Sequence, residues 1–178
     1  ELSAAAGADP VAFRLRHLHD PRARDVIRLA AEKFGWPRAP RKANHGVGFA
    51  FGKYKNLMAY VAIAVEVAVV RETGQVTLEH AEVAVDSGQI VNPDGIRNQI
   101  EGGVIQSASW TLYEALKFDT RRIRSFDWSS YPILRFSAVP RSLNVHLLDR
   151  PGAPFLGAAE ASMGPTAGAL GNALFDAT

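Results

Sequence analysis

The residues best suited to chemistry lie in a loop of small side chains that ends in a single carboxylate. Residues 151–166 read Pro-Gly-Ala-Pro-Phe-Leu-Gly-Ala-Ala-Glu-Ala-Ser-Met-Gly-Pro-Thr, which places Glu160 at the start of an expected Ala/Gly-rich helix. Free backbone N–H groups at such a start can meet an anion, with the carboxylate beside them as a base. The plainer alternative is that Glu160 only complements the helix dipole, worth about 0.3–1 kcal/mol, and the residues alone favour that role.

A second candidate site is an amide-bearing stretch beside two adjacent glycines. Gln99 precedes Gly102 by three residues and Gly103 by four, so on a helix its amide projects over a bare patch of backbone. Each glycine costs about 1 kcal/mol relative to alanine, which indicates that something packs close to the helix there. A ligand and a second helix both satisfy this pattern, and the residues leave the two open.

Other familiar kinds of site find little support in the residue pattern. The glycine-rich run 46–52 lacks the spacing of a dinucleotide-binding loop, and no helix is expected after it. The five histidines are dispersed, so we expect no metal bound by side chains of this chain alone. The absence of cysteine excludes thiolate ligands, disulfides and thiol nucleophiles, and no serine has the spacing typical of a hydrolase.

Composition bounds the partners and the setting. The 178 residues carry 20 basic and 18 acidic side chains, a net charge of +2, and the basic ones are scattered, so nucleic acid is not an expected partner. The longest apolar run, 57–70, contains Glu66 and is short for a bilayer, so no membrane span is expected. The chain opens without Met and ends within an expected helix. We therefore expect both ends to be cuts, with the true N-terminus and any export signal absent.

Helix signals come first along the chain. Asp9-Pro10 and Asp20-Pro21 each predict a helix start, because a capping carboxylate precedes a proline at the first helical position. The second helix should end near Gly35. Two prolines and three cations in 37–42 then indicate an extended connection, which is the best candidate for an internal boundary.

Alternating apolar residues follow and predict a sheet. Strands of a half-buried sheet are expected over 46–52 and 59–69, and a turn at 71–75 returns the chain as a third strand over 76–85. These three strands form an antiparallel meander.

A long helix is expected after the turn residues 87–95, capped by Asn92 or Asp94 and running to about Leu116. One face of it should carry Ile96, Ile100, Val104 and Trp110 or Thr111. The remaining elements are a hairpin over 117–124, a loop with Trp128, Tyr131 and Pro132, a strand over 143–148 and a helix after Glu160. The fold class is therefore α+β, with an antiparallel or mixed sheet and packed helices around one core.

Three motifs, in this order, resemble those of one family, the molybdenum hydroxylases of the xanthine dehydrogenase and aldehyde oxidase type. They are Val-Asp-Ser-Gly-Gln-Ile-Val-Asn-Pro at 85–93, Gln-Ile-Glu-Gly-Gly at 99–103 and Gly-Ala-Ala-Glu at 157–160. Further stretches at 5–15, 128–136 and 164–166 look closest, within that family, to the large subunit of isoquinoline 1-oxidoreductase, which acts on N-heterocycles. The resemblance spans essentially the whole chain.

The resemblance implies part of the molybdopterin-binding domain of a larger bacterial oxidoreductase subunit. Residues 1–40 would be a helical segment continuing from a missing upstream region, and 41–178 a C-terminal molybdopterin-binding domain truncated at its end. The cofactor would be molybdenum–molybdopterin cytosine dinucleotide, shared with the upstream segments. Electrons would leave through iron–sulfur clusters on a small 2Fe-2S partner subunit, and a cytoplasmic location is favoured.

The same resemblance implies roles for individual residues. Glu160 matches the base of the family's Gly-x-Gly-Glu turn, Gln99 matches a glutamine beside the cofactor, and Gly157, Ala158 and Ala159 match the loop around it. The implied reaction hydroxylates a carbon of an N-heterocyclic aromatic or an aldehyde with oxygen from water. The isolated chain should be inactive, because the other cofactor-contacting segments lie upstream.

Two positions depart from the family pattern. Ala159 stands where the family usually has glycine, and its extra methyl group could crowd the cofactor or change the turn. Ser87 stands where cysteine is common, which should change little. The alternative function is a non-catalytic scaffold or interaction domain that retains the fold, for which Ala159 is the hint.

Overall fold

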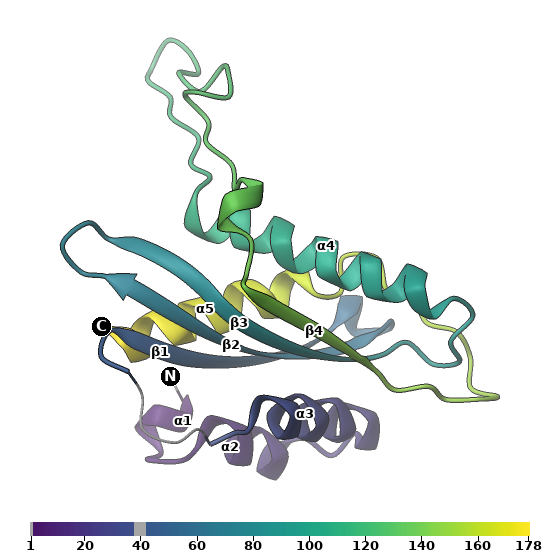
Figure 1. The fold of residues 1–178 in the computed structure, drawn as a ribbon. Coiled ribbons are helices and arrows are strands. Elements are labelled where there is room, and N and C mark those ends of the chain that lie inside the picture. Colours follow the sequence, from purple (N-terminus) through teal and green to yellow (C-terminus); the bar gives the residue numbers. More distant parts are fainter. Residues whose placement is uncertain (1, 38–41) are drawn as a thin grey trace.

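The computed structural model describes residues 2–37 and 42–178 and confirms the α+β class (Figure 1). Its sheet has the order β1-β2-β3-β4, with bounds β1 His45–Lys53, β2 Tyr60–Val70, β3 Gln75–Asp86 and β4 Ser142–Leu147. The first three strands form the predicted antiparallel meander, and β4 lies parallel to β3, so the sheet is mixed.

Helices lie on both sides of this sheet. On one side are α1 (Leu2–Ala5), α2 (Pro10–His17) and α3 (Pro21–Phe34), and on the other α4 (Pro93–Leu112) and α5 (Met163–Ala177) (Figure 1). Single 3₁₀ turns occur at Tyr54–Asn56 and Phe136–Ala138. Within the described residues, no helix is long and apolar enough to cross a membrane.

The expectation of a half-buried sheet is wrong for the central strand β2. Val61 and Ile63 pack into a core formed with α4 and α5, and the intervening Ala62 and Ala64 pack into a second core beneath α3. The small alanine side chains let α3 approach closely, so both faces of the strand are buried. The expected single core is therefore two apolar layers separated by the sheet.

The predicted helix boundaries in the first layer are confirmed by their caps. The carboxylates of Asp9 and Asp20 each accept two backbone N–H groups at the start of α2 and α3. Gly35 ends α3 in the left-handed conformation, at a φ of 73°. The predicted connection over 37–42 falls largely on residues 38–41, outside the described residues.

Helix α4 carries the middle motif and is held at its start by Asn92. The Asn92 side chain accepts the Gly95 N–H at 2.9 Å, which decides between the two predicted caps. Ile100 and Val104 are fully buried as predicted. Trp110, in contrast, is 48% exposed, because at 3.6 residues per turn it lies well off the stripe through those two residues.

The chain leaves the body of the molecule after α4. The helix ends at Leu112, earlier than the predicted end near Leu116. Residues 113–141 then project as an arm (Figure 1), in which an antiparallel bridge between Phe118 and Ile123 confirms the predicted hairpin.

Helix α5 lies directly on β1 because glycines alternate along that strand. A Cβ atom at Gly46 would lie 2.1 Å from the Ala173 carbonyl oxygen, and one at Gly48 would lie 2.0 Å from the Ala169 carbonyl oxygen. The run 46–52 is therefore a strand shaped for close helix packing, in agreement with its rejection as a phosphate loop.

The outer edge of β1 is occupied by side chains from the helices. The Val47 N–H donates to Asp176 Oδ2 at 2.7 Å. The Phe49 carbonyl oxygen accepts from Arg14 Nη2 at 3.1 Å and from Asn172 Nδ2 at 3.0 Å. Arg14 lies on α2, and the other two side chains lie on α5.

Candidate functional site

Two of the sequence motifs meet at one hydrogen bond. The Gln99 amide Nε2 on α4 donates to the Ala159 carbonyl oxygen, in the loop before α5, at 2.8 Å. This contact brings Gln99 next to the loop of Gly157, Ala158 and Ala159 that ends at Glu160. All five residues named from the sequence therefore lie in one region.

A hollow of about 430 Å³ opens beside this contact. In the described part of the chain, the backbone N–H groups of Ala158 and Ala159 donate to no protein acceptor. Free N–H groups and amide side chains are suited to hydrogen-bonding the polar edges and phosphate oxygens of a ligand. The wall of the hollow draws on all three motifs and includes Ser87, Gln89, Asn92, Gln99, Ala158 and Ala159.

Glu160 is exposed and is held by a tyrosine from the turn between β1 and β2. Its Oε2 atom accepts the hydroxyl of Tyr54. That hydrogen bond, followed by one from the residue's own N–H and by the charge of Lys55, holds the pKa of Glu160 below its usual value. The same bond raises the pKa of Tyr54. Glu160 is thus a carboxylate at neutral pH and can accept a proton.

Glu160 also lines a second hollow, of about 620 Å³, whose wall is largely apolar. The carboxylate consequently borders a space wide enough for an aromatic ring. This space lies among β1, the end of α4 and the start of α5, and its lining includes Phe51, Tyr54, Trp110, Met163 and Pro165.

The two adjacent glycines on α4 differ in their surroundings: one contacts a neighbouring helix, and the other is open to a ligand. A Cβ atom at Gly103 would lie 2.3 Å from Ser162 Oγ, so this glycine serves packing against the start of α5. Gly102 is exposed, and a Cβ atom there would meet nothing within 4 Å. Only Gly102, one turn from Gln99, remains open to a ligand.

Ala159 has a backbone conformation that suits glycine. Its φ is +30°, in the left-handed region that side chains with a Cβ atom avoid. A glycine at this position, as the resemblance implies for the family, would suit this turn, and the alanine holds it under strain.

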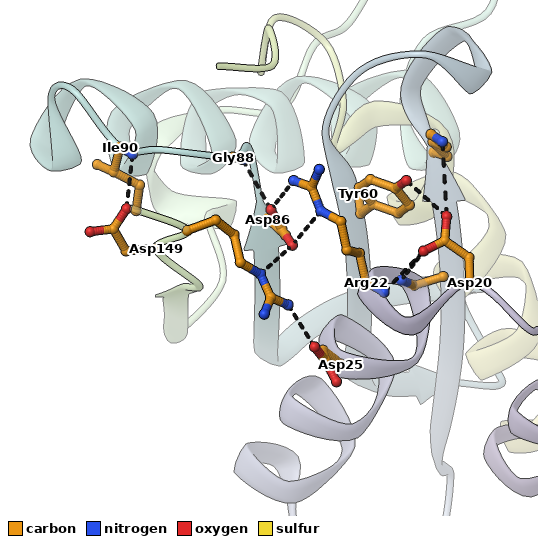
Figure 2. A network of polar contacts seen from close by, with 11 residues as sticks. Asp20, Arg22, Asp25, Tyr60, Asp86, Gly88, Ile90 and Asp149 are labelled. Atoms are coloured by element: carbon orange, nitrogen blue, oxygen red, sulfur yellow. Dashed lines mark hydrogen bonds and ion pairs between the residues drawn. The ribbon is translucent and has the colours of Figure 1, made fainter. Parts of the chain in front are cut away.

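A buried ionic network fixes the turn after β3, which forms one wall of the first hollow (Figure 2). Asp86 is fully buried, and its Oδ2 accepts from Nε of Arg22 and Nε of Arg150, each at 2.9 Å. Its Oδ1 accepts the Gly88 N–H at 3.0 Å, and Arg150 Nη2 also donates to Asp25 at 2.6 Å. Burial by itself raises the pKa of Asp86, but these bonds outweigh burial and leave the pKa below its usual value.

The loop before Glu160 is tied to the same turn. The Leu156 N–H donates to the Ser87 carbonyl oxygen at 2.7 Å, and the Gly152 N–H donates to Gln89 Oε1 at 3.0 Å. The two loops that wall the first hollow thus support each other, and the network of Figure 2 anchors both to α3.

Sequence reasoning missed the residues that surround Glu160 from other parts of the chain. Tyr54, Lys55 and Trp110 belong to no motif, and the order of elements alone does not say which turn faces the 157–160 loop. A usable signal was present at Tyr54-Lys55-Asn56, which interrupts two apolar strands with polar turn residues at one end of the sheet. Among the described residues, no group of His, Cys, Asp or Glu is arranged to hold a metal ion.

The fold and the three assembled motifs define a molybdenum-cofactor domain. The chain belongs to the molybdopterin cofactor-binding domain family, whose profile matches residues 11–140. The resemblance drawn from the motifs is thereby confirmed. The family match covers α2 to α4, including the 85–93 and 99–103 motifs.

The relatives are dehydrogenases and oxidoreductases, two of them named as single subunits. The chain is 40% identical to the B subunit of nicotinate dehydrogenase from Pseudomonas putida, over 100% of its own length and 16% of that protein. It is 35% identical to the beta subunit of isoquinoline 1-oxidoreductase from Brevundimonas diminuta, over 84% of its own length and 19% of that protein. Its fold matches the crystal structure of quinoline 2-oxidoreductase from Pseudomonas putida 86 with a TM-score of 0.62 and 25% identity, covering 67% of this chain and 16% of that one. The chain thus spans less than a fifth of the length of these proteins.

The residues around the first hollow fit a molybdopterin group. The amide side chains of Gln89, Asn92 and Gln99 can pair with the hydrogen-bonding edges of a pterin. The free N–H groups of Ala158 and Ala159 can pair with anionic oxygens. No side chain of this hollow supplies a thiolate or imidazole ligand, so the metal would be held through the organic part of the cofactor.

Proposed function

We propose that this chain is part of the catalytic subunit of an oxidoreductase that hydroxylates a ring carbon of an N-heterocyclic aromatic. In this proposal Glu160 is the base, and Gln99 with Gly157, Ala158 and Ala159 contacts the cofactor. The observation that supports it is the Gln99–Ala159 hydrogen bond, because it joins Gln99 to the loop in which Ala159 lines the first hollow and Glu160 lines the apolar one.

The choice of substrate class rests on the relatives and on the apolar hollow. Nicotinate, isoquinoline and quinoline, which name three of the relatives, are all N-heterocyclic aromatics. The hollow beside Glu160 offers Tyr54 and Trp110 as aromatic neighbours for a planar ring. An aldehyde is the second substrate class, since aldehyde oxidoreductase from Desulfovibrio gigas shares the fold at a TM-score of 0.58.

The residues of this chain supply binding, orientation and a proton acceptor. The bound molybdenum cofactor would supply the two-electron oxidant for hydroxylation with oxygen from water. Gln99 and the N–H groups of the 158–159 loop hold and orient that group. Glu160, ionised at neutral pH, takes up one proton at a carboxylate oxygen as the new C–O bond forms. The apolar wall around Trp110 and Met163 borders that carboxylate and offers a surface for the ring of the substrate.

The remaining partners follow from the same family membership. We propose the cytosine dinucleotide form of the cofactor, a small subunit with 2Fe-2S clusters, a cytoplasmic location, and an upstream part of the same subunit joined to the helical segment 1–40. The arm over 113–141 supports such an upstream part, because its exposed apolar side chains need a covering surface. They are Leu116, Phe118, Ile123, Phe126, Trp128 and Phe136, each more than half exposed. Without that part, residues 41–178 would complete no active site, and the isolated chain would be inactive.

The test uses the complete catalytic subunit with its small subunit and the variant Glu160→Gln. We expect the variant to keep its molybdenum content and to lose N-heterocycle-dependent dye reduction by at least about a hundredfold, the contribution of a general base. Glu72→Gln is the matched control, because Glu72 is exposed in the turn between β2 and β3, far from the site.

The outcomes separate the two functions considered. Loss of turnover with retained molybdenum supports Glu160 as the base. A wild-type protein that carries no molybdenum would instead support the non-catalytic scaffold or interaction domain. A Glu160→Gln variant that turns over as fast as Glu72→Gln would remove Glu160 from the mechanism.

A further inference from the structure

We propose that Tyr54 is a positioning residue that fixes the orientation of the Glu160 carboxylate. The inference rests on the proposed function, in which Glu160 is the base. Tyr54 lies 106 positions before Glu160 in the sequence, and its hydroxyl donates to Oε2 of that carboxylate. No other side chain in the described part of the chain hydrogen-bonds to Glu160.

The turn that carries Tyr54 is held firmly against the loop that carries Glu160. The Tyr54 N–H donates to the Ala59 carbonyl oxygen at 2.9 Å, and the Ala59 N–H donates to the Gly157 carbonyl oxygen at 3.3 Å. Backbone contacts therefore join the two segments independently of the Tyr54–Glu160 side-chain contact. A shift of the turn would therefore also shift the loop, so the Tyr54 phenol and the Glu160 carboxylate keep the same relative position.

The turn is maintained at a conformational cost. Lys55 and Asn56 both have positive φ, 50° and 59°, in a region where residues with a Cβ atom are uncommon. Such strain persists where the surrounding structure over-determines it, and it concentrates at functional sites. Lys55 Nζ also lies 5.3 Å from the centre of the Tyr54 ring, so the ring is bounded on that side.

The chemistry of the contact suits orientation without blocking proton uptake. An ionised carboxylate offers about four acceptor sites on its two oxygens. Tyr54 and the residue's own N–H occupy two of these, and the others remain able to take a proton. Because the phenol stabilises the charged form, removing it should make Glu160 easier to protonate.

The kinetic test is Tyr54→Phe in the complete, cofactor-loaded enzyme, with Glu160→Gln measured alongside. The ring is kept, so the variant should fold and retain its molybdenum. We expect kcat to fall about two- to tenfold, the worth of one hydrogen bond. We also expect the acid limb of the pH–rate profile to move to higher pH, because the pKa of Glu160 rises when its hydrogen-bond donor is lost.

A chemical test reads the contact without turnover. Tetranitromethane nitrates tyrosines through the phenolate, so the raised pKa of Tyr54 should slow its nitration. In the cofactor-free complete subunit we expect Glu160→Gln to speed nitration of Tyr54, measured by peptide mass spectrometry. Tyr131 is the internal control, since its hydroxyl donates to Glu114 at 2.8 Å and should nitrate at an unchanged rate.

The results distinguish this inference from the proposed function. If Glu160→Gln is inactive while Tyr54→Phe leaves kcat and the acid limb unchanged, Tyr54 has no positioning role and Glu160 remains the base. If Glu160→Gln stays active, Glu160 is not the base, and both the proposed function and the positioning role of Tyr54 are wrong. Equal nitration of Tyr54 in wild type and Glu160→Gln would show that the contact is not made, which overturns the inference independently of activity.

Discussion

Ala159 carries one methyl group more than the glycine that the resemblance to the family implies at this position. The loop before Glu160 turns through a positive φ at this residue, and its carbonyl oxygen accepts the Gln99 amide. The turn is therefore kept although the residue best suited to it is missing. The energy of keeping it comes from the contacts on either side, including the packing of Gly157 against Met58.

Replacing Ala159 by glycine should relieve this strain. We expect Ala159→Gly to raise the free energy of unfolding by about 0.5–1 kcal/mol, measured by thermal unfolding of the chain. The neighbouring Ala158→Gly is the control and should lower it by a similar amount, because it only adds freedom to the unfolded state. Two equal losses would mean that residue 159 is not strained.

At the level of single residues, the sequence predicted the members of the site better than their surroundings. Gln99 and Glu160 could be named because their motifs resemble a family pattern, and the structure brings them together. Tyr54 could not be named, because its proximity to Glu160 depends on how the β1–β2 turn docks against a loop over a hundred residues later. Glu82 is similar. It is buried and accepts the Asn144 amide Nδ2 at 2.8 Å from β4, the strand whose pairing with β3 the sequence did not reveal.

Among the elements, helix α4 allows a direct test of helix packing. Its two adjacent glycines look alike in the sequence, yet only one of them faces a neighbour. Gly102→Ala should raise the free energy of unfolding by up to about 1 kcal/mol, since alanine is the better helix former and the site is open. Gly103→Ala should lower it by about 1–3 kcal/mol, because its Cβ atom would overlap the buried Ser162 hydroxyl.

The pair of variants is its own control, with the same chemical change at adjacent positions of one helix. Thermal unfolding followed by circular dichroism gives both values under identical conditions. Effects of the same sign and size would contradict the assignment of Gly103 to helix packing. Gly102→Ala can then be carried into the complete enzyme, where a loss of bound cofactor would indicate that a ligand approaches this glycine.

Local sequence signals predicted most helices and strands, but they did not predict the pairing of strands that lie far apart in the sequence. Capping residues and alternation gave α2, α3 and the β1–β3 meander, because these depend on side chains close in sequence. The parallel pairing of β4 with β3 was not foreseen, since the strand returns after the arm and could have joined either edge. Burial of both faces of β2 was missed because alanine reads as a weak apolar signal.

For the whole molecule, the Asp86 network joins helix α3 to the sheet and to the segment after β4. Arg22 comes from α3, Asp86 from the end of β3, and Arg150 from the segment after β4 (Figure 2). Asp86→Asn would leave two guanidinium groups without their shared carboxylate. We expect a loss of about 3–5 kcal/mol in the free energy of unfolding, the usual cost of breaking a buried ion pair. Asp94→Asn, at an 87% exposed side chain, is the control and should change little.

The same network predicts a pH dependence. Because the pKa of Asp86 is lower in the folded state than its ordinary value near 4, its contribution is complete above about pH 4. The contribution is lost as the pH falls through the lower folded pKa. Acid unfolding of the wild-type chain should therefore steepen below about pH 4, and Asp86→Asn should flatten that part of the curve. Parallel curves for the two proteins would exclude Asp86 as the group that titrates.

The occupied outer edge of β1 has a consequence for how copies of this chain behave in concentrated solution. An uncovered edge strand offers a row of unmatched N–H and C=O groups on which a second molecule can add its own strand and begin an aggregate. Here Asp176 takes the Val47 N–H, and Arg14 and Asn172 take the Phe49 carbonyl. The chain thus resists self-templating at this edge through three side chains on neighbouring helices, whatever chemistry its loops perform.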